Sequence, residues 1–203
     1  MPTGGVIVLH GTSSAGKTTL AHTLVEQFAG TGACWIVIGI DDYIGRLPPE
    51  WQRIDDHVGR FAADGLTFDL ATPGGIRVGP VGEQLLAAYR GAVGSAARAG
   101  LHVVVDDVAI GVAAVHAWSD ALAGIVVLRV RVDADDAVKA AREAARGDRL
   151  VGLARAQGPY VHEGMRYDVA VDTGTDDPAS AAARVRAAWS AHVENHRGFD
   201  GPG

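Results

Sequence analysis

The chain has 203 residues, of which 48% are hydrophobic and 21% charged, enough for one sizeable domain of ordinary globular composition. Its formal net charge of −6 excludes an overall basic surface for nucleic acid or an anionic membrane, so neither is an expected partner. The single cysteine, Cys34, excludes an internal disulfide, and no signal peptide or membrane-spanning apolar run is evident, so we expect a cytoplasmic protein.

The first elements predicted along the chain are a buried strand, a loop, a helix and a second strand. Residues 6–10 form a continuous apolar run without alternation, which is typical of a strand buried on both faces of a parallel sheet. Apolar residues then recur at helical spacing from Leu20 to Phe28. The second strand, residues 35–40, leads directly into Asp41. This order predicts the opening of a right-handed βαβ unit.

The rest of the chain alternates between helices and strands after one irregular segment. Residues 46–81 contain several prolines and many glycines, and they favour at most a hairpin around 66–68 and 76–78. A long irregular stretch inside a compact domain is often functional. The later elements are expected at 82–98 (helix), 102–105 (strand), 112–122 (helix), 125–132 (strand), a helix capped by Asp133 and ending near 145, a short helix after 149, 168–171 (strand) and 178–195 (helix). We expect a single domain over residues 1–196 and a flexible tail at 197–203.

A glycine-rich loop lies between the first strand and the first helix, the setting that a phosphate-binding loop requires. It matches Gly-x₄-Gly-Lys-Thr, and the candidate nucleotide-binding residues are Gly11, Thr12, Ser13, Ser14, Ala15, Gly16, Lys17, Thr18 and the adjoining Thr19. Glycines let successive N–H groups point inward, and the helix N-terminus adds a positive partial charge. Lys17 is expected to reach the β- and γ-phosphates and Thr18 to ligate Mg²⁺. The loop predicts a site for ATP or GTP, and the lack of an Asn-Lys-x-Asp guanine motif favours ATP.

Acidic residues follow the predicted strands at the edge of the sheet where open α/β proteins bind ligands. Asp41 follows the second strand and could accept a proton from an attacking hydroxyl. Asp106 and Asp107 follow the third strand. Asp106 is favoured for holding Mg²⁺, whereas Asp107 could cap the next helix. The alternative for these acids is that they cap helices and face water, and it is strongest for Asp42.

Three arginines gather near one predicted helix end, at Arg142, Arg146 and Arg149. The first two are four residues apart and share a helix face, and Gly147 offers a hinge or a helix stop. A lid that carries arginines can close over a transferred phosphoryl group and neutralise its charge. The alternative is a solvated helix end whose basic groups favour the negative end of the helix dipole. The residues alone do not decide between the two.

Taken together, these segments resemble chloramphenicol phosphotransferase, a small P-loop kinase. The matching stretches run in order through nearly the whole chain, at residues 13–17, 39–41, 76–80, 105–108, 142–149, 161–164 and 167–173. The resemblance implies a three-layer α/β P-loop kinase fold with five parallel strands in the order 2-3-1-4-5. It also implies phosphorylation of a small-molecule hydroxyl with ATP and Mg²⁺. Asp41 matches the family's proposed general base, and Lys17 its P-loop lysine. Arg146 and Arg149 match arginines of the lid, which is expected at about 142–157.

The acceptor is the open part of this interpretation. Residues 53–76 depart from the family pattern, and we expect residues 42–81 to bind the acceptor. The acidic residue Asp42 also departs from it and could favour a polar or cationic acceptor. Against this, the basic residues between 42 and 90 are matched by at least as many acids, which favours an uncharged acceptor; they are Arg46, Arg53, Arg60, Arg77 and Arg90.

The leading hypothesis is an ATP-dependent O-phosphotransferase that acts on chloramphenicol or another antibiotic and so confers resistance by inactivating it. One alternative is a metabolic kinase with a shikimate-like, gluconate-like or nucleoside acceptor. The other is a non-catalytic ATP-binding switch, although such a switch needs neither Asp41 nor the lid arginines. The oligomeric state is open, with a homodimer as one option.

Overall fold

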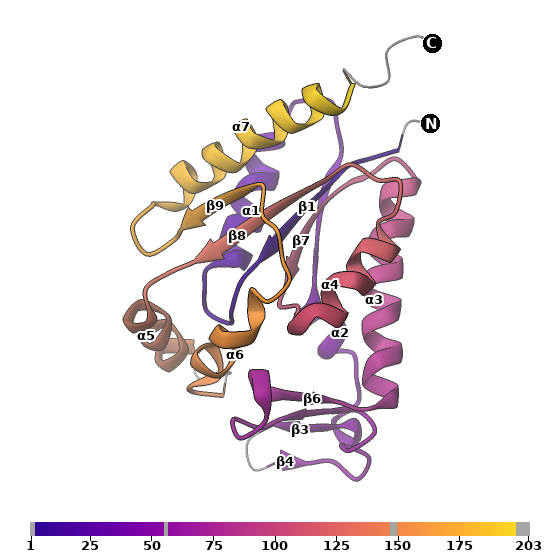
Figure 1. The fold of residues 1–203 in the computed structure, drawn as a ribbon, viewed down its shortest axis with the longest axis vertical. Coiled ribbons are helices and arrows are strands. Elements are labelled where there is room, and N and C mark those ends of the chain that lie inside the picture. Colours follow the sequence, from indigo (N-terminus) through magenta and orange to yellow (C-terminus); the bar gives the residue numbers. More distant parts are fainter. Residues whose placement is uncertain (1–2, 55–56, 147–149, 198–203) are drawn as a thin grey trace.

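The computed structural model describes residues 3–54, 57–146 and 150–197. A parallel sheet with helices on both faces forms its centre, and a smaller sheet lies at one end (Figure 1). The central sheet has the strand order β2 (Trp35–Gly39), β7 (His102–Asp107), β1 (Val6–His10), β8 (Val127–Asp133) and β9 (Val169–Asp172). Numbered along the chain within this sheet, the order is 2-3-1-4-5, and every neighbouring pair is parallel. The predicted three-layer α/β fold is confirmed.

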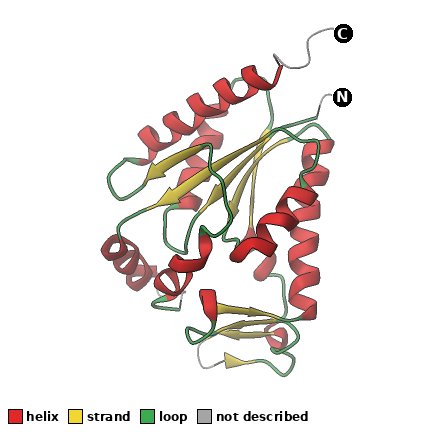
Figure 2. Cartoon of the chain, in the orientation of Figure 1, coloured by secondary structure: helices red, strands yellow, loops and turns green. Residues whose placement is uncertain are grey.

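Two layers of helices enclose this sheet (Figure 2). The first layer is α1 (Lys17–Phe28) and α7 (Pro178–Arg197), and the second is α3 (Pro80–Arg98) and α4 (Gly111–Ala121). Strand β1 contributes Ile7 and Leu9 to the core on the first side and Val6 and Val8 to the core on the second. Its residues are therefore apolar without alternation, because both of its faces are buried.

The irregular segment folds into a second sheet beside the start of α3. Its strands stand in the order β4 (His57–Val58), β3 (Gln52–Ile54), β5 (Leu66–Phe68) and β6 (Ile76–Val78). Strands β5 and β6 pair antiparallel, as predicted. The short helical elements around them are α2 (Ile40–Ile44), η1 (Pro49–Trp51) and η2 (Pro73–Gly75). We call β3–β6 with η2 the acceptor sheet.

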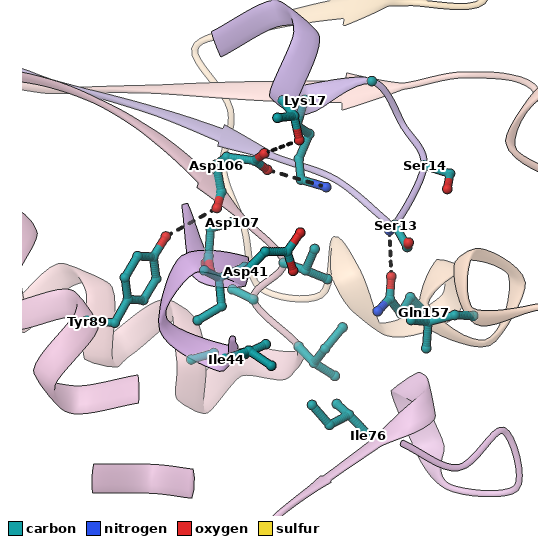
Figure 3. Close-up of a pocket in the computed structure, with 18 of the residues that line it drawn as sticks. Ser13, Ser14, Lys17, Asp41, Ile44, Ile76, Tyr89, Asp106, Asp107 and Gln157 are labelled. Carbon is teal, nitrogen blue, oxygen red and sulfur yellow. Dashed lines mark hydrogen bonds and ion pairs between the residues drawn. The ribbon is translucent and has the colours of Figure 1, made fainter. Parts of the chain in front are cut away.

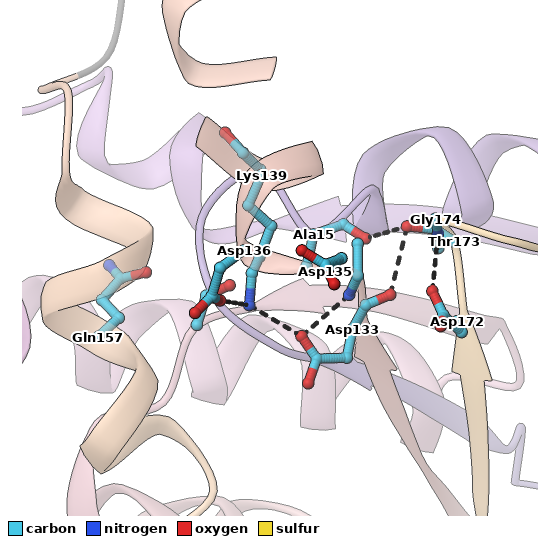
Figure 4. A network of polar contacts seen from close by, with 12 residues as sticks. Ala15, Asp133, Asp135, Asp136, Lys139, Gln157, Asp172, Thr173 and Gly174 are labelled. Carbon is cyan, nitrogen blue, oxygen red and sulfur yellow. Dashed lines mark hydrogen bonds and ion pairs between the residues drawn. The ribbon is translucent and has the colours of Figure 1, made fainter. Parts of the chain in front are cut away.

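Helices α5 (Asp136–Arg146) and α6 (Leu153–Val161) follow β8. The prediction that Asp133 caps α5 is wrong, because β8 continues through this residue. Asp135 provides the cap, since its Oδ1 accepts the N–H of Ala137 at 3.0 Å. Asp133 instead accepts a hydrogen bond from Lys139 Nζ at 3.1 Å (Figure 4). It also accepts one from the guanidinium of Arg131 at 3.0 Å. Among the helices that the structure describes, none combines the length and apolarity of a membrane span.

Candidate active site

The glycine-rich loop connects β1 to α1 and lines a cavity of about 650 Å³. Both glycines of the motif are required by the local geometry. A Cβ on Gly11 would lie 2.0 Å from the carbonyl oxygen of Val132, so no side chain fits there. Gly16 has φ +87°, a left-handed conformation that favours glycine. A Cβ at this position would also lie 2.8 Å from Thr173 Oγ1, so there is no space for a side chain. The loop can therefore keep the curvature that turns its N–H groups toward a phosphate.

Several polar groups of the loop are buried without a partner among the described residues. The hydroxyl oxygens of Thr12, Ser13 and Ser14 have no hydrogen-bond partner. Lys17 is 5% exposed, and its Nζ donates to the carbonyl of Thr12 at 2.8 Å. Buried donors of this kind are costly unless a ligand or water satisfies them. Their position at the N-terminus of α1 fits the oxygens of a polyphosphate.

Two oxygen groups at the same place fit a magnesium ion. Thr18 Oγ1 donates to Asp106 Oδ2 at 2.5 Å. Lys17 Nζ lies 3.8 Å from Asp106 Oδ1 (Figure 3). Asp106 is held there because β7 pairs with β1, which places it opposite Leu9, just before the loop. Mg²⁺ prefers hydroxyl, carboxylate and phosphate oxygens and keeps several waters, so two protein ligands are sufficient.

The neighbouring Asp107 has a different environment. Its carboxylate accepts the indole N–H of Trp118 at 2.7 Å, and it does not cap α4, whose N-cap position is Ile110. Burial raises the pKa of Asp107 to about 6, against the hydrogen bond from Trp118. Successive side chains of a strand point to opposite faces, and this alternation separates Asp106 from Asp107.

Asp41 lies in the first turn of α2, directly after β2. It is exposed and lines the same cavity as Lys17, Thr18 and Asp106 (Figure 3). The adjacent Asp42 is also exposed but is not among the residues that line the cavity. The structure therefore brings the predicted base, but not its acidic neighbour, to the cavity that holds the phosphate-binding loop.

The predicted lid arginines occupy different positions. Arg142 donates to the carbonyl of Ser14 at 3.3 Å and to the carbonyl of Thr173 at 2.8 Å. Thr173 Oγ1 in turn donates to the carbonyl of Ala15 at 2.7 Å (Figure 4). Arg142 thus connects the phosphate-binding loop to the segment after β9. Arg146 is exposed and lines the cavity, and Arg149 lies outside the described residues.

Sequence reasoning missed Gln157 on α6. Its Oε1 accepts the backbone N–H of Ser13 at 2.6 Å, and its side chain is buried, with 5% exposure (Figure 3). The N-terminus of α6 is held by Glu143 of α5, whose carboxylate accepts the N–H groups of Gly152 and Ala154 at 2.9 and 2.7 Å. No motif marks Gln157, since a glutamine at helical spacing is ordinarily solvated.

A second group of polar residues forms a hydrogen-bond network around His10, the residue directly before the loop. His10 is 1% exposed, its Nε2 accepts the N–H of Ala109 at 3.1 Å, and its Nδ1 lies 2.7 Å from the hydroxyl of Tyr167. That hydroxyl also lies 2.7 Å from Nδ1 of His162. Burial lowers the pKa of His10 to about 4, so the imidazole is neutral at pH 7. The network joins the end of β1 to the segments that follow β7 and α6.

Comparisons with known proteins show which family the sequence matches. Residues 4–190 match the family described as chloramphenicol phosphotransferase-like protein. A Mycobacterium tuberculosis protein named "Putative O-phosphotransferase" is 34% identical over 198 residues, which cover 91% of this chain and 81% of that protein.

Solved structures of low sequence identity share the fold. The APS kinase of M. tuberculosis, solved with AMPPNP and APS, has a TM-score of 0.63 at 17% identity, over 94% of this chain and 99% of that one. A gluconokinase from Sinorhizobium meliloti has a TM-score of 0.59 at 18% identity, over 98% and 99%. The shikimate kinase of Acinetobacter baumannii, solved with shikimate, has a TM-score of 0.58 at 15% identity, over 93% and 94%.

Proposed function

The chain belongs to the chloramphenicol phosphotransferase-like family of P-loop phosphotransferases, and we propose that it moves the γ-phosphate of ATP to a hydroxyl of a small-molecule acceptor. The observation that carries this proposal is that Asp41 shares one cavity with Lys17, Thr18 and Asp106. A protein that only binds ATP needs no carboxylate on the acceptor side. The non-catalytic switch is therefore the weaker interpretation.

Each residue of the cavity has a role in this reaction. The amides and hydroxyls of the loop, with Lys17, bind the β- and γ-phosphates. Thr18 and Asp106 would hold Mg²⁺, which would neutralise charge on the phosphates. Asp41 takes the proton of the acceptor hydroxyl while the oxygen of that hydroxyl bonds to the γ-phosphorus. The bond between the γ-phosphorus and the β,γ-bridging oxygen breaks, and ADP leaves. Arg146 and Arg149 complete the charge neutralisation from a lid at about 142–157, and Arg142 positions the loop.

The cavity extends from the loop in two directions, and the position of Asp41 supports assigning one of them to the acceptor. One side reaches Thr173, Asp176 and Pro178 beyond α1 and suits the nucleoside of ATP. The other reaches the acceptor sheet and contains Asp41. We therefore assign the segment 42–81 to acceptor binding, through those of its residues that line the cavity, within a single kinase domain over residues 1–196.

The lining of the acceptor side favours an acceptor with an apolar body, such as chloramphenicol or another antibiotic. Side chains of the acceptor sheet and the adjoining helices form the apolar part of this lining, namely Ile44, Leu66, Phe68, Ile76, Val78 and Leu86. A shikimate-like or gluconate-like acceptor presents several hydroxyls, which would lose hydrogen bonds against these side chains. A metabolic kinase for polyols is thus the less favoured candidate.

A mass-spectrometric screen tests the proposal. The purified protein is incubated with ATP, Mg²⁺ and a panel of hydroxylated antibiotics and metabolites that includes chloramphenicol. We expect one compound to gain one phosphate, with ADP formed in equal amount. Lys17→Ala serves as the inactive control. ATP binding without phosphate transfer to any compound would contradict the proposal and favour the switch.

A further inference from the structure

Arg90 of α3 has an unusual position on the acceptor side of the cavity. The cations that line the cavity, within the part of the chain described, are Lys17, Arg90, Arg142 and Arg146. All but Arg90 belong to the phosphate-binding loop or to α5. We infer that Arg90 binds a planar group with two oxygens, a carboxylate or a nitro group, on the apolar body of the acceptor alcohol. This inference rests on the proposed function.

The hydrogen-bonding capacity of Arg90 is unused. Its Nε is buried without a hydrogen-bond partner, and the guanidinium forms no hydrogen bond or ion pair with any described residue. Arg90 is half-buried, and an Nε that is removed from water without a partner is unfavourable, so this nitrogen in a binding cavity indicates that a ligand supplies the partner. The planar fork of five N–H donors matches the two oxygens of a carboxylate or nitro group.

The described acidic residues around Arg90 form no ion pair with its guanidinium. Asp107 is close enough to interact with the charge of Arg90, but its carboxylate is bonded to Trp118 and forms no ion pair with Arg90. Glu83 lies seven residues before Arg90, on the same face of α3, and also lines the cavity. Its side chain is exposed. It lies about 10 Å from Arg90 along the helix axis, which is the rise of seven residues. The positive charge on the acceptor side is thus concentrated at one end.

The space between these charges is apolar. Leu86 lies between Glu83 and Arg90 on α3, and α4 contributes the small residues Ala113 and Ala117 to the cavity wall. Small side chains on α4 leave room for a bulky group, and the apolar surroundings strengthen the interaction of Arg90 with an anion. The acceptor therefore combines an apolar body with one planar two-oxygen group.

The other arginines of this region do not line the cavity, which explains why counting charges along the segment describes the acceptor poorly. Arg46 donates to the carbonyl of Asp42 and lies over the ring of Tyr43. Arg77 is exposed on β6, whose neighbouring residues Ile76 and Val78 face the cavity. Arg77 is therefore a matched control for Arg90, since it carries the same charge in the same region outside the cavity.

Three benzyl alcohols with different para substituents test the inference. They are 4-(hydroxymethyl)benzoate, 4-nitrobenzyl alcohol and 4-methylbenzyl alcohol, which differ in the group offered to Arg90. The measured quantities are kcat/KM for phosphate transfer to each compound, and the KM for ATP, in the wild type, Arg90→Gln and Arg77→Gln.

We expect the wild type to prefer the carboxylate over the methyl compound by about ten- to a hundredfold, the range for one charged hydrogen-bonded pair, with the nitro compound between them. Arg90→Gln should lose this preference while keeping the rate with the methyl compound and the KM for ATP. Arg77→Gln should behave as the wild type. If only the carboxylate compound is preferred over the methyl compound, the natural acceptor is acidic. If the nitro compound is preferred over the methyl compound as strongly as the carboxylate compound is, the natural acceptor is a neutral nitroaryl alcohol.

Equal efficiencies with the three compounds in the wild type, or an equal loss with all three in Arg90→Gln, would overturn the inference while leaving the kinase function intact. If none of the three is phosphorylated, calorimetric binding of 4-(hydroxymethyl)benzoate decides. Binding that Arg90→Gln abolishes supports the inference, and absence of binding overturns it. The proposed kinase function fails separately, if no compound of the wider panel gains phosphate.

Discussion

Gln157 accepts the backbone N–H of Ser13 at 2.6 Å, so helix α6 contacts the phosphate-binding loop at a donor that also faces the nucleotide cavity. The same helix packs against the acceptor sheet. A Cβ on Gly75 in η2 would lie 2.5 Å from Leu153 and 3.4 Å from Ala156. Helix α6 therefore contacts both the phosphate-binding loop and the acceptor sheet.

Gln157→Glu should weaken ATP binding at least tenfold. The carboxylate keeps an acceptor for the amide of Ser13 but places a negative charge beside the phosphates, and about 1.4 kcal/mol of repulsion already corresponds to a factor of ten. Gln84→Glu, on the exposed surface of α3, makes the same change in charge and should leave the affinity unchanged. Equilibrium titration with a fluorescent ATP analogue measures both. An unchanged affinity in Gln157→Glu would show that the contact is lost when nucleotide binds.

Asp41→Asn should reduce kcat by about 10²- to 10⁴-fold, the contribution of a general base, and leave ATP affinity within about threefold of the wild type. The amide cannot take the proton of the acceptor hydroxyl. Asp42→Asn is the control, because Asp42 is equally exposed but does not line the cavity. Steady-state ADP release with a phosphorylated acceptor provides the measurement. Near-normal turnover in Asp41→Asn would refute the assignment of the base.

Arg142 and Arg146 should respond differently to replacement by methionine. Arg142→Met removes donors from the carbonyls of Ser14 and Thr173, so we expect a loss of about 2 kcal/mol in stability and a higher KM for ATP. Arg146→Met removes an exposed charge at the cavity, so we expect a lower kcat with an unchanged melting temperature. Thermal unfolding and steady-state kinetics of both variants make the comparison. The same effects in both variants would contradict separate roles.

The buried imidazole of His10 should make the protein sensitive to acid. Its pKa is lowered by burial from 6.5 to about 4, so the unfolded chain binds its proton first as the pH falls. Stability from this residue is complete above pH 6.5 and is lost down to about pH 4, and the loss is about 3 kcal/mol. His10→Gln can keep both hydrogen bonds without titrating, so its free energy of unfolding should fall correspondingly less between pH 7 and pH 4.

The control for this comparison is His22→Gln, whose histidine is exposed on α1. Denaturant unfolding at several pH values measures the free energy in each variant. The buried Asp107 titrates in the opposite sense, because its raised pKa favours the folded state in acid, but it is present in every variant and cancels. A pH dependence in His10→Gln identical to that of the wild type would contradict a buried neutral imidazole.

The sequence by itself determined the features that depend on local pattern. The apolar run of β1 predicted a buried strand, because a strand buried on both faces has no alternation of apolar and polar residues. The glycines predicted the phosphate-binding loop, because Gly16 must take a positive φ. The position of Asp41 directly after a predicted strand marked it as a candidate base, and the resemblance to a family provided the strand order. The antiparallel pair β5–β6 was also visible, since apolar and polar residues alternate in both strands and turn residues lie between them.

Only the tertiary structure decided which of several equivalent residues enters the site. Asp106 and Asp107 are adjacent in the chain, yet the pleat of β7 sends one to Thr18 and the other to Trp118. Gln157 and Ser13 are 144 positions apart and meet because α6 packs on the loop. Arg90 lines the cavity because of the face of α3 on which it lies, whereas the arginines at 46, 53, 60 and 77 lie on other elements and do not. Contacts of this kind depend on how elements pack and rotate against one another, which local periodicity does not encode.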